Sequence, residues 1–203
     1  MTDPLLKYRE QHKHRLNYMP WLYWSLKPKH REWAEQWQAE YQAYLMEMET
    51  VEIGKNCFIS PLAHIFAERG RKISIGDNTF IAADCTLHGP LQIGSEVAIN
   101  HHCILDGGRA GIKLHDQVRI AAYSHLYAFD HGMDLERPIY QQAVTSKGIE
   151  IGQDVWLGAH VGIKDGVKIG DHAVIGMNSM VTKDIEKHAI VAGNPARLIR
   201  YRK

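Results

Sequence analysis

Aliphatic residues occupy every sixth position over three stretches of this chain, and glycine directly follows many of them. An α-helix repeats its buried face about every 3.6 residues and a simple strand every second residue, so neither accounts for a period of six. The pattern instead predicts short strands joined by tight corners. The fifteen aliphatic positions are Ile75, Ile81, Leu87, Ile93, Ile99, Leu105, Leu114, Ile120, Leu126, Ile151, Leu157, Ile163, Ile169, Ile175 and Val181.

Small or β-branched residues lie four positions after the aliphatic ones and support the same register. They are Thr79, Cys85, Val97, Cys103, Val118, Ser124, Val155, Val161, Val167, Ala173 and Ser179. Three hexads complete one turn of a triangular prism, so residues 18 apart stack at about the 4.8 Å inter-strand spacing. Hexapeptide periods are typical of parallel β-helices. An ordinary sandwich would match this period only by accident, so we predict a mainly β chain folded as a parallel β-helix.

The first 50 residues follow a different pattern, with large apolar residues at three- and four-residue spacing. This spacing predicts an amphipathic helix from about Lys29 to Glu49, which Pro28 would begin, and a shorter helix from about Pro4 to Asn17. The aromatic stripe could bind a partner or an acceptor. A β-helix also has an open end whose strand edge must be covered. We therefore expect residues 1–50 to form a helical cap on a domain that spans residues 51–203.

Composition narrows the class of protein. The 203 residues carry 24 basic and 23 acidic side chains, so nothing favours nucleic acid or an anionic membrane as a partner. No run reaches the roughly 20 apolar residues of a membrane span. The N-terminus lacks an apolar signal region, so a cytoplasmic location is expected. Cys57, Cys85 and Cys103 all occupy the small interior position, which favours buried thiols over catalysis or a disulfide.

The longest interruption of the period runs from about Tyr127 to Gly148 and is predicted to be a protruding loop. Coils in register are scaffold, whereas loops that leave the register can carry a functional site. The root of the loop carries His131, which is flanked by Asp130 and Gly132. Histidine is well suited to accept a proton near neutral pH, which makes His131 the leading candidate base among 13 histidines.

Several motifs resemble those of the hexapeptide-repeat acetyltransferases, in particular the galactoside and maltose O-acetyltransferases and the enzymes that acetylate exopolysaccharide sugars. The resemblance covers roughly residues 50 to 200. The motifs are Ile151–Ala159 (IGQDVWLGA), Val181–Ile185 (VTKDI), Ala192–Arg197 (AGNPAR), Asn100–Asp106 (NHHCILD) and Phe129–Gly132 (FDHG). Together they are specific, although a single hexad would not be.

The resemblance implies a left-handed coil and a homotrimer with active sites between neighbouring prisms. It implies an acetyl-CoA-dependent O-acetyltransferase that transfers directly in a ternary complex, with no metal. His131 would be the general base, and the amide of Ala159 would stabilise the oxyanion. Asn100 and Asp106 would hold the acceptor or order the base. Asp106 is the weaker match, since its distance from Asn100 is about one residue shorter than in the family.

The resemblance also implies a CoA groove along the last coils. Trp156, Ala159 and the main chain at Met177 would line the groove. Thr182, Lys183, Arg197 and Arg200 would bind the phosphates, although a solvated basic C-terminus is the alternative interpretation of the arginines. The family usually has Ala-Gly where this chain has Met177-Asn178, and the bulkier methionine could reshape the groove.

Two other classes stay open. The first is a zinc hydratase on the same coil, similar to the gamma-class carbonic anhydrases, which would need three converging histidines. His125 and His131 could contribute, but the Gly-His motif of that family is absent. The second is a non-catalytic trimeric scaffold. The acceptor of an acetyltransferase also stays open among a simple sugar, a lipid- or nucleotide-linked glycan precursor and an antibiotic, because one cofactor groove can serve many acceptors.

Overall fold

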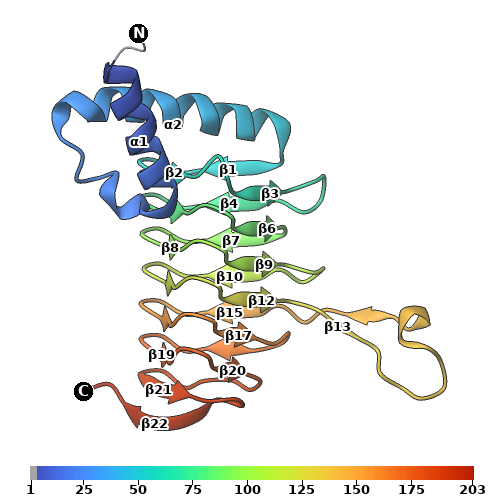
Figure 1. Cartoon of the computed structure of the whole chain (residues 1–203). Coiled ribbons are helices and arrows are strands. Elements are labelled where there is room, and N and C mark those ends of the chain that lie inside the picture. The colour runs from blue at the N-terminus through green and yellow to red at the C-terminus, as the bar shows by residue number, and fades with distance from the viewer. Residues whose placement is uncertain (1–3) are drawn as a thin grey trace.

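The computed structural model of this protein describes residues 4–203 as a column of stacked coils with helices at its N-terminal end (Figure 1). Three sheets form the three faces of the column. Face 1 contains β1 (Val51–Ile53), β4 (Ile73–Ile75), β7 (Leu91–Ile93), β10 (Ile112–Leu114), β15 (Ile149–Ile151) and β18 (Lys168–Ile169). Face 2 contains β2 (Phe58–Ile59), β5 (Phe80–Ile81), β8 (Ala98–Ile99), β11 (Arg119–Ile120), β16 (Trp156–Leu157), β19 (Val174–Ile175), β21 (Ala189–Ala192) and β22 (Arg197–Tyr201). Face 3 contains β3 (His64–Phe66), β6 (Thr86–His88), β9 (Ile104–Asp106), β12 (His125–Tyr127), β17 (Gly162–Ile163) and β20 (Met180–Val181).

The predicted register is confirmed. All strand pairs within the three faces are parallel except β21 with β22. Ile75 pairs with Ile93, one turn later in the coil. Each of the fifteen aliphatic residues on the six-residue period is buried, as are the eleven small or β-branched residues named with them. The interior of the column is therefore the single apolar core that the period predicts, and the mainly β parallel β-helix is confirmed.

The corners between faces require a backbone conformation that side chains rarely adopt. Among residues 4–203, twelve non-glycine residues have a positive φ, and several of them, such as Tyr123 at +63°, are not the Asn or Asp that tolerate it best. Each coil hydrogen-bonds to the next through these corners; for example, His102 N–H donates to Ala83 O at 3.1 Å. Stacking thus holds corner residues in a conformation that their local propensity disfavours, and successive corners lie directly above one another.

The two predicted helices are present, with boundaries within a residue of those expected. They are α1 (Pro4–Tyr18) and α2 (Pro28–Met48), separated by the short helix η1 (Pro20–Leu22). They bury the apolar outer surface of face 2 at its N-terminal end. The buried cluster there consists of Leu16, Tyr23, Ala34, Phe58, Phe80 and Ala98.

Helix α2 also covers the open end of the coil (Figure 1). The side chain of Gln38 accepts a hydrogen bond from Ile59 N–H at 2.8 Å and donates to Ile59 O at 3.1 Å. Gln42 donates to Cys57 O at 2.9 Å. These amides supply the partners that a further strand would otherwise provide, which is the task expected of a cap on an unpaired sheet edge.

The C-terminal end is closed by the chain itself. Strand β22 runs antiparallel to β21, and Arg202 N–H then donates to His188 O at 2.7 Å. The Arg202 guanidinium lies 3.0 Å from Asp154 Oδ2, which also contacts His172 Nδ1 at 3.0 Å. The hydrogen bond from His172, followed by the contact with Arg202, lowers the pKa of Asp154.

The three faces differ in the outward-pointing residues that pair in a row from strand to strand. Face 1 presents a mostly charged or polar row: Glu52, Ser74, Gln92, Lys113, Glu150 and Lys168. Face 2 presents a mostly apolar row: Phe58, Phe80, Ala98, Arg119, Trp156 and Val174. Face 3 presents apolar, small and imidazole groups: His64, Thr86, Ile104, His125, Gly162 and Met180. Face 3 has no acid, lysine or arginine in this row.

Candidate functional site

The longest interruption of the coil is a hairpin that projects far from the column (Figure 1). It consists of β13 (Asp130–His131), η2 (Ile139–Gln141) and the antiparallel strand β14 (Val144–Thr145). His131 lies on β13 opposite Val144, and its imidazole is exposed. The ring of Phe129 lies 6.3 Å from the His131 ring, edge-on. The hairpin therefore carries an exposed imidazole next to Asp130, at its root.

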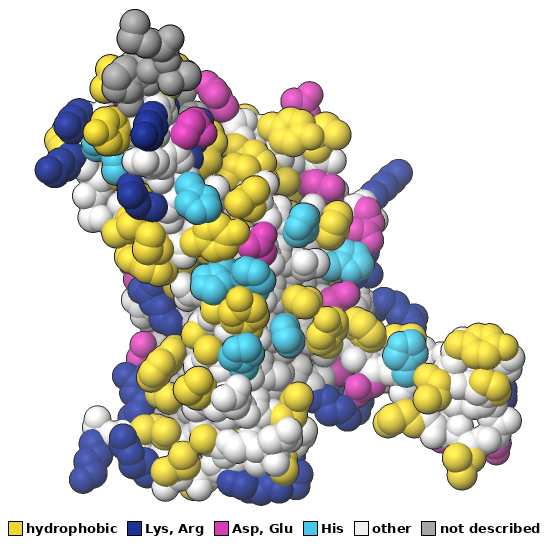
Figure 2. All heavy atoms as spheres, in the orientation of Figure 1, with side chains coloured by type: hydrophobic (Ala, Val, Ile, Leu, Met, Phe, Trp, Pro, Cys, Tyr) yellow, Lys and Arg dark blue, Asp and Glu magenta, His cyan; other side chains and the backbone are white. Residues whose placement is uncertain are grey.

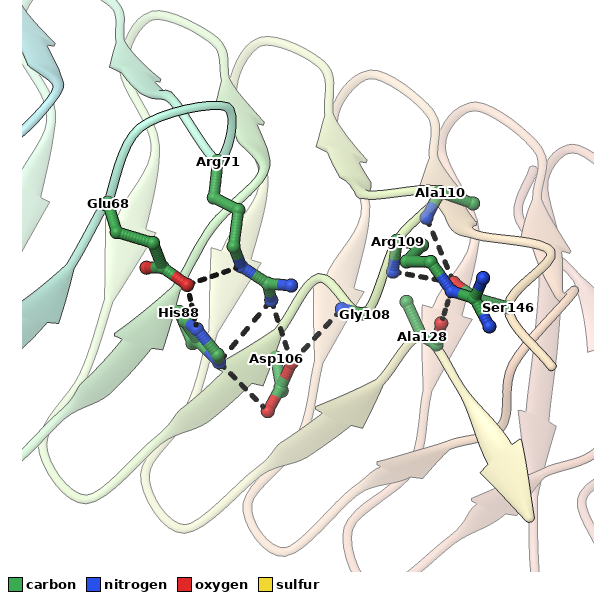
Figure 3. A network of polar contacts seen from close by, with 9 residues as sticks. All are labelled: Glu68, Arg71, His88, Asp106, Gly108, Arg109, Ala110, Ala128 and Ser146. Carbon is green, nitrogen blue, oxygen red and sulfur yellow. Dashed lines mark hydrogen bonds and ion pairs between the residues drawn. The ribbon is translucent and has the colours of Figure 1, made fainter. Parts of the chain in front are cut away.

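The base of the hairpin is fixed to the coil (Figure 3). Ser146 Oγ donates to Ala128 O and accepts hydrogen bonds from the amides of Arg109 and Ala110 at 3.0 and 2.9 Å. A side chain at Gly108 would collide with Ala128 O, so the close approach requires glycine. On the opposite side of the hairpin, Asp130 forms an ion pair with Lys164. Both arms of the hairpin are thus anchored before it leaves the coil.

The tip of the hairpin is held by one side chain and is strongly apolar on its surface. Gln142 accepts from Asp134 N–H at 2.9 Å and donates to the carbonyls of Asp134 and Arg137 at 2.8 and 2.7 Å. An ordered tip that exposes large apolar groups is suited to contact with another molecule. The exposed apolar residues are Met133, Leu135, Ile139 and Tyr140.

The corner between faces 2 and 3 collects three of the predicted site residues: Asn100, Ala159 and Met177. Asn100 donates from its side chain to Ile120 O at 2.9 Å. The main-chain N–H groups of Ala159 and Met177 donate no hydrogen bond to any described residue. The two amides lie on successive coils, as the hydrogen bond from Asn178 N–H to Ala159 O at 2.9 Å shows. This corner therefore offers two free amide donors in line along the column.

Gly158 is required where these two corners approach each other. A Cβ at this position would lie 2.6 Å from Met177 N. A side chain there would push the two corners apart and move the free amide donors relative to each other.

A column of stacked rings on the same corner was missed by the sequence analysis. The rings of His102 and Tyr123 lie 4.7 Å apart, and those of Tyr123 and His160 lie 4.9 Å apart and are nearly parallel. All three occupy the positive-φ position of successive corners. That position lies just before the small interior residue of the hexad, so aligning the corners by the period would have revealed the column.

The ring column continues toward α1 through His101, which lies 6.0 Å from the Tyr18 ring. Burial, and to a lesser extent the neighbouring His102, lowers the pKa of His101. Tyr18 donates to Asp84 Oδ2 at 2.9 Å, and this hydrogen bond is the main reason that the pKa of Tyr18 is raised. Helix α1 therefore ends beside the corner that carries Asn100.

Asp106 lies at the opposite end of face 3 from Asn100 and belongs to a network of charged groups (Figure 3). Its carboxylate lies 3.3 Å from His88 Nδ1 and 3.8 Å from the Arg71 guanidinium, and it accepts from Gly108 N–H at 3.0 Å. Glu68 contacts both His88 and Arg71. Asp106 and Asn100 are thus not brought together within one chain.

The predicted cofactor-binding residues fall into separate groups. Thr182, Lys183 and Arg197 line a common pocket of about 350 Å³ at the C-terminal end of the column. Arg200 lies nearby on β22, paired with Ile190, and does not line the pocket. Trp156 points outward from face 2 with 54% of its surface exposed. Three of the four predicted phosphate ligands therefore share one pocket, at a distance along the column from His131.

Among residues 4–203, no three His, Cys, Asp or Glu side chains converge in a way that could hold a metal ion. No helix there is both long and apolar enough to cross a membrane.

Comparison with known proteins identifies the class. A family profile described as bacterial transferase hexapeptide (six repeats) matches residues 148–183. The galactoside O-acetyltransferase of Escherichia coli K12 is 30% identical over 165 residues, which cover 80% of this chain and 70% of that protein. The putative colanic acid biosynthesis acetyltransferase WcaF of the same strain is 28% identical over 89% of this chain and 86% of its own. The chain therefore belongs to the hexapeptide-repeat acetyltransferases, and the resemblance seen in its motifs is confirmed.

Solved structures support the same assignment. A mutant of AntD, an N-acyltransferase from Bacillus cereus crystallised with dTDP and coenzyme A, superimposes with a TM-score of 0.72 at 32% identity. The match covers 80% of this chain and 90% of AntD. One relative is thus named an O-acetyltransferase and a structural neighbour an N-acyltransferase. The protein is accordingly an acyltransferase, and neither the non-catalytic scaffold nor the zinc hydratase finds support among these relatives.

Proposed function

We propose that the protein transfers an acetyl group from acetyl-CoA to a hydroxyl of a sugar or of another small acceptor. One observation carries the proposal: the corner that bears Asn100 also presents the free amides of Ala159 and Met177 in line along the column. Unpaired donors fixed on a rigid scaffold are suited to bind amide and thioester oxygens without reorganisation. The name of the galactoside O-acetyltransferase relative supports O-transfer to a sugar.

His131 acts as the general base in this proposal. Its imidazole accepts the proton of the acceptor hydroxyl as that oxygen attacks the thioester carbonyl carbon. The Ala159 amide donates to the resulting oxyanion, and the C–S bond then breaks. The imidazolium returns its proton to the departing CoA thiolate, so the products are the acetyl ester and free CoA. General-base help of this kind contributes about 10²–10⁴-fold in rate.

The acceptor is held by Asn100, with Asp106 in a supporting role. Asn100 lies on the corner that carries the free amides and beside the ring column. Asp106 already shares its carboxylate with His88 and Arg71. Of the two roles that the motif implies, holding the acceptor or ordering the base, we therefore assign Asp106 the second. It would order the region at the base of the hairpin, from which His131 projects.

The CoA groove runs along the last coils. Trp156 packs against the cosubstrate, and the amides of Ala159 and Met177 bind its pantetheine arm. The pocket lined by Thr182, Lys183 and Arg197 takes the phosphates, with Arg200 at its edge. Two cations and a hydroxyl match the phosphate chemistry. AntD, which superimposes on this chain, was crystallised with coenzyme A.

A homotrimer completes the site. His131 is displayed on an anchored hairpin that points away from its own column, and the hairpin tip exposes Leu135 and Tyr140. Face 3 exposes Phe66, Tyr127 and Met180. Its row from His64 to Met180 contains no acid, lysine or arginine. The row that holds Phe66 and Tyr127 also holds Asp106, whose carboxylate is engaged by His88 and Arg71. Covering these surfaces with identical copies would bring the His131 of one protomer to the Ala159 corner of the next. We infer a cytoplasmic enzyme, since three buried cysteines are free, as expected in a reducing compartment.

A panel of acceptors tests the proposal through CoA thiol release. The panel contains simple sugars, nucleotide-linked sugars with hydroxyl or amino groups, and chloramphenicol. With the best acceptor, His131→Ala should lower kcat about 10²–10⁴-fold while KM for acetyl-CoA changes little. His115→Ala is the matched control, because His115 lies on another corner, against Glu150. Full activity of the His131→Ala enzyme would refute the assigned base, and preference for an amine acceptor would replace O- by N-transfer.

A further inference from the structure

The N-terminal helices enclose a cleft that the proposed acetyl transfer does not use. Two adjoining cavities of about 390 and 500 Å³ lie where α1, η1 and α2 meet. His12, Lys29 and His30 line both cavities. The combined space is within the range of small-molecule sites. The other lining residues are Leu5, Tyr8, Arg9, Arg15, Leu16, Leu22, Ser25, Leu26, Lys27 and Trp33.

The cleft is strongly positive. Arg9, Arg15, Lys27 and Lys29 are all present, and none of the described lining residues is an aspartate or a glutamate. Figure 2 shows Lys, Arg and His side chains gathered over the N-terminal helices. Within residues 4–203, none of these four cations forms an ion pair with a carboxylate. The whole chain carries a net charge of only +1, so this concentration of charge is local.

Neighbouring cations outside the cleft behave differently. Lys13 pairs with Glu10 at 3.0 Å, and Arg31 lies 3.8 Å from Glu35. Lys13 and Arg31 are on the same helices as the cleft residues. These helices therefore carry acidic side chains that pair with some of their basic residues. The four cleft cations have no carboxylate partner among residues 4–203, and they are gathered around one space. Like charges held together there cost free energy that a bound anion would offset.

Two half-buried imidazoles line the floor of the cleft. The rings of His12 and His30 lie 4.5 Å apart, and Trp33 Nε1–H donates to His30 Nδ1 at 3.5 Å. When Nδ1 accepts this hydrogen bond, the neutral His30 ring carries its proton on Nε2 and is a donor there. Burial lowers the pKa of His12, with further contributions from His30, Arg15 and Lys29. The charges of Arg15 and Lys29, which contribute to this shift, would attract a negatively charged ligand.

Aromatic surface adjoins the charges. Arg9 lies over the Trp33 ring at 5.8 Å, which positions its guanidinium at the wall of the cleft. Tyr8 is largely exposed on the same wall. Arginine, lysine and histidine donors around a space of this size match the oxygens of a phosphate group rather than a neutral sugar.

We propose that this cleft is a second binding site, which takes a phosphate-bearing anion of about the size of a nucleotide. The site lies on the N-terminal helices, whereas Lys183 and Arg197 lie at the other end of the column (Figure 1). It does not depend on acetyl transfer, so it can be tested with no acyl donor present. It stands whether or not His131 is the catalytic base.

Calorimetric titration of the full-length protein with inorganic pyrophosphate tests the site. Arg9→Gln and Lys29→Gln should each weaken binding roughly tenfold, because each removes a charge-assisted hydrogen bond. Lys7→Gln and Arg31→Gln are the matched controls: they remove the same charge from α1 and α2 outside the cleft, and should leave binding unchanged. Lys183→Ala separates the cleft from the CoA phosphates: the binding event that Arg9→Gln weakens should persist in this variant, and its loss would assign that event to the other pocket. Far-UV circular dichroism of each variant confirms that the helices are intact.

Two further titrations identify the source of the phosphate. Uridine diphosphate should bind more tightly than pyrophosphate, and Tyr8→Ala should remove that advantage alone. Phosphatidylcholine vesicles that contain phosphatidic acid should bind no better than pure phosphatidylcholine. Absence of pyrophosphate binding, equal weakening by the control variants, or binding to the acidic vesicles alone would each overturn the proposal.

Discussion

Faces 2 and 3 of the column both present apolar residues outward, but the protein treats them differently. On face 2, Phe58 and Phe80 are buried by the chain's own helices, and Phe58 has no exposed surface. On face 3, Phe66 remains 49% exposed and Met180 38% exposed. Exposed apolar surface of this kind is typical of an interface. The comparison indicates that the N-terminal end of face 2 is covered within the chain, whereas the apolar surface of face 3 is left for neighbouring copies.

The charged face supports this interpretation. The central row of face 1 alternates acids with lysines in its lower half, and Glu150 contacts both Lys113 and His115. These contacts, led by the hydrogen bond from His115, lower the pKa of Glu150. Such a surface is stable in water. The three faces of one regular coil therefore have three different environments, and only the outward residues differ between them.

A charge on face 3 should have the largest effect. Ile104→Arg introduces a charge into the middle of the proposed interface and should give monomers by light scattering. Because the site would lose the His131 of the neighbour, kcat/KM should fall about 10²–10⁴-fold. Gln92→Arg makes the corresponding change on face 1 and should leave both the trimer and the activity intact. A fully active monomeric Ile104→Arg protein would disprove the shared site.

Removal of a buried ring on face 2 should act on folding instead. Phe58→Ala should lower the free energy of unfolding by about 3–5 kcal/mol, since the ring is completely buried against Tyr23 and Trp37. The shift in Tm should not depend on protein concentration. The matched variant on face 3, Phe66→Ala, should give a concentration-dependent shift, because oligomerisation contributes to its stability. The same concentration dependence for both variants would remove the distinction between the faces.

The packing of the helices on face 2 should also contribute less to the free energy of unfolding at high pH. Burial raises the pKa of Tyr23 from 10.0 to about 12. The neutral ring therefore stabilises the folded state fully below pH 10, and this stabilisation is lost as the pH rises toward 12, by about 2–3 kcal/mol. Chemical denaturation of the wild type and of Tyr23→Phe measures the difference, in which the other tyrosines cancel. If both proteins lose stability equally over this range, Tyr23 is not the group responsible.

The cap on the coil end should show the smallest of these effects. Gln38→Leu leaves the N–H and the C=O of Ile59 without partners and should cost about 1–3 kcal/mol in unfolding free energy. Gln36→Leu, on the exposed side of the same helix, should change the unfolding free energy by less than about 0.5 kcal/mol. Denaturant titration compares the two, and equal costs would mean that the amide of Gln38 does not protect the strand edge.

Most of the coil was predictable because its period is local. Each hexad repeats the same requirement for one aliphatic and one small residue, so Ile75 and Thr79 could be assigned to the interior without knowledge of the other coils. The helices were predictable for the same reason, to within a residue at each end. The glutamine pair on α2 was not, since Gln38 and Gln42 look like ordinary polar helix residues until the strand edge is placed beneath them.

The site was only partly predictable. Motifs identified Asn100 and Ala159 one by one, but the ring column from His102 to His160 requires alignment of corners separated by interruptions of unequal length. The motif that suggested Asp106 gave no sign that Arg71 and His88 would engage its carboxylate. Such contacts join residues 18 or more apart, and no short motif spans that distance.

By itself, the sequence determined the repeating interior, the three-faced column, the two helices and the residues from which a site could be built. Tertiary structure decided which outward rows are covered, which amides stay free and where the cationic cleft opens between α1 and α2. The physical reason is that burial of a periodic core depends on residue type at fixed spacing, which each hexad encodes locally. Exposure and charge pairing depend on what lies opposite a side chain, and only the folded chain brings those partners together.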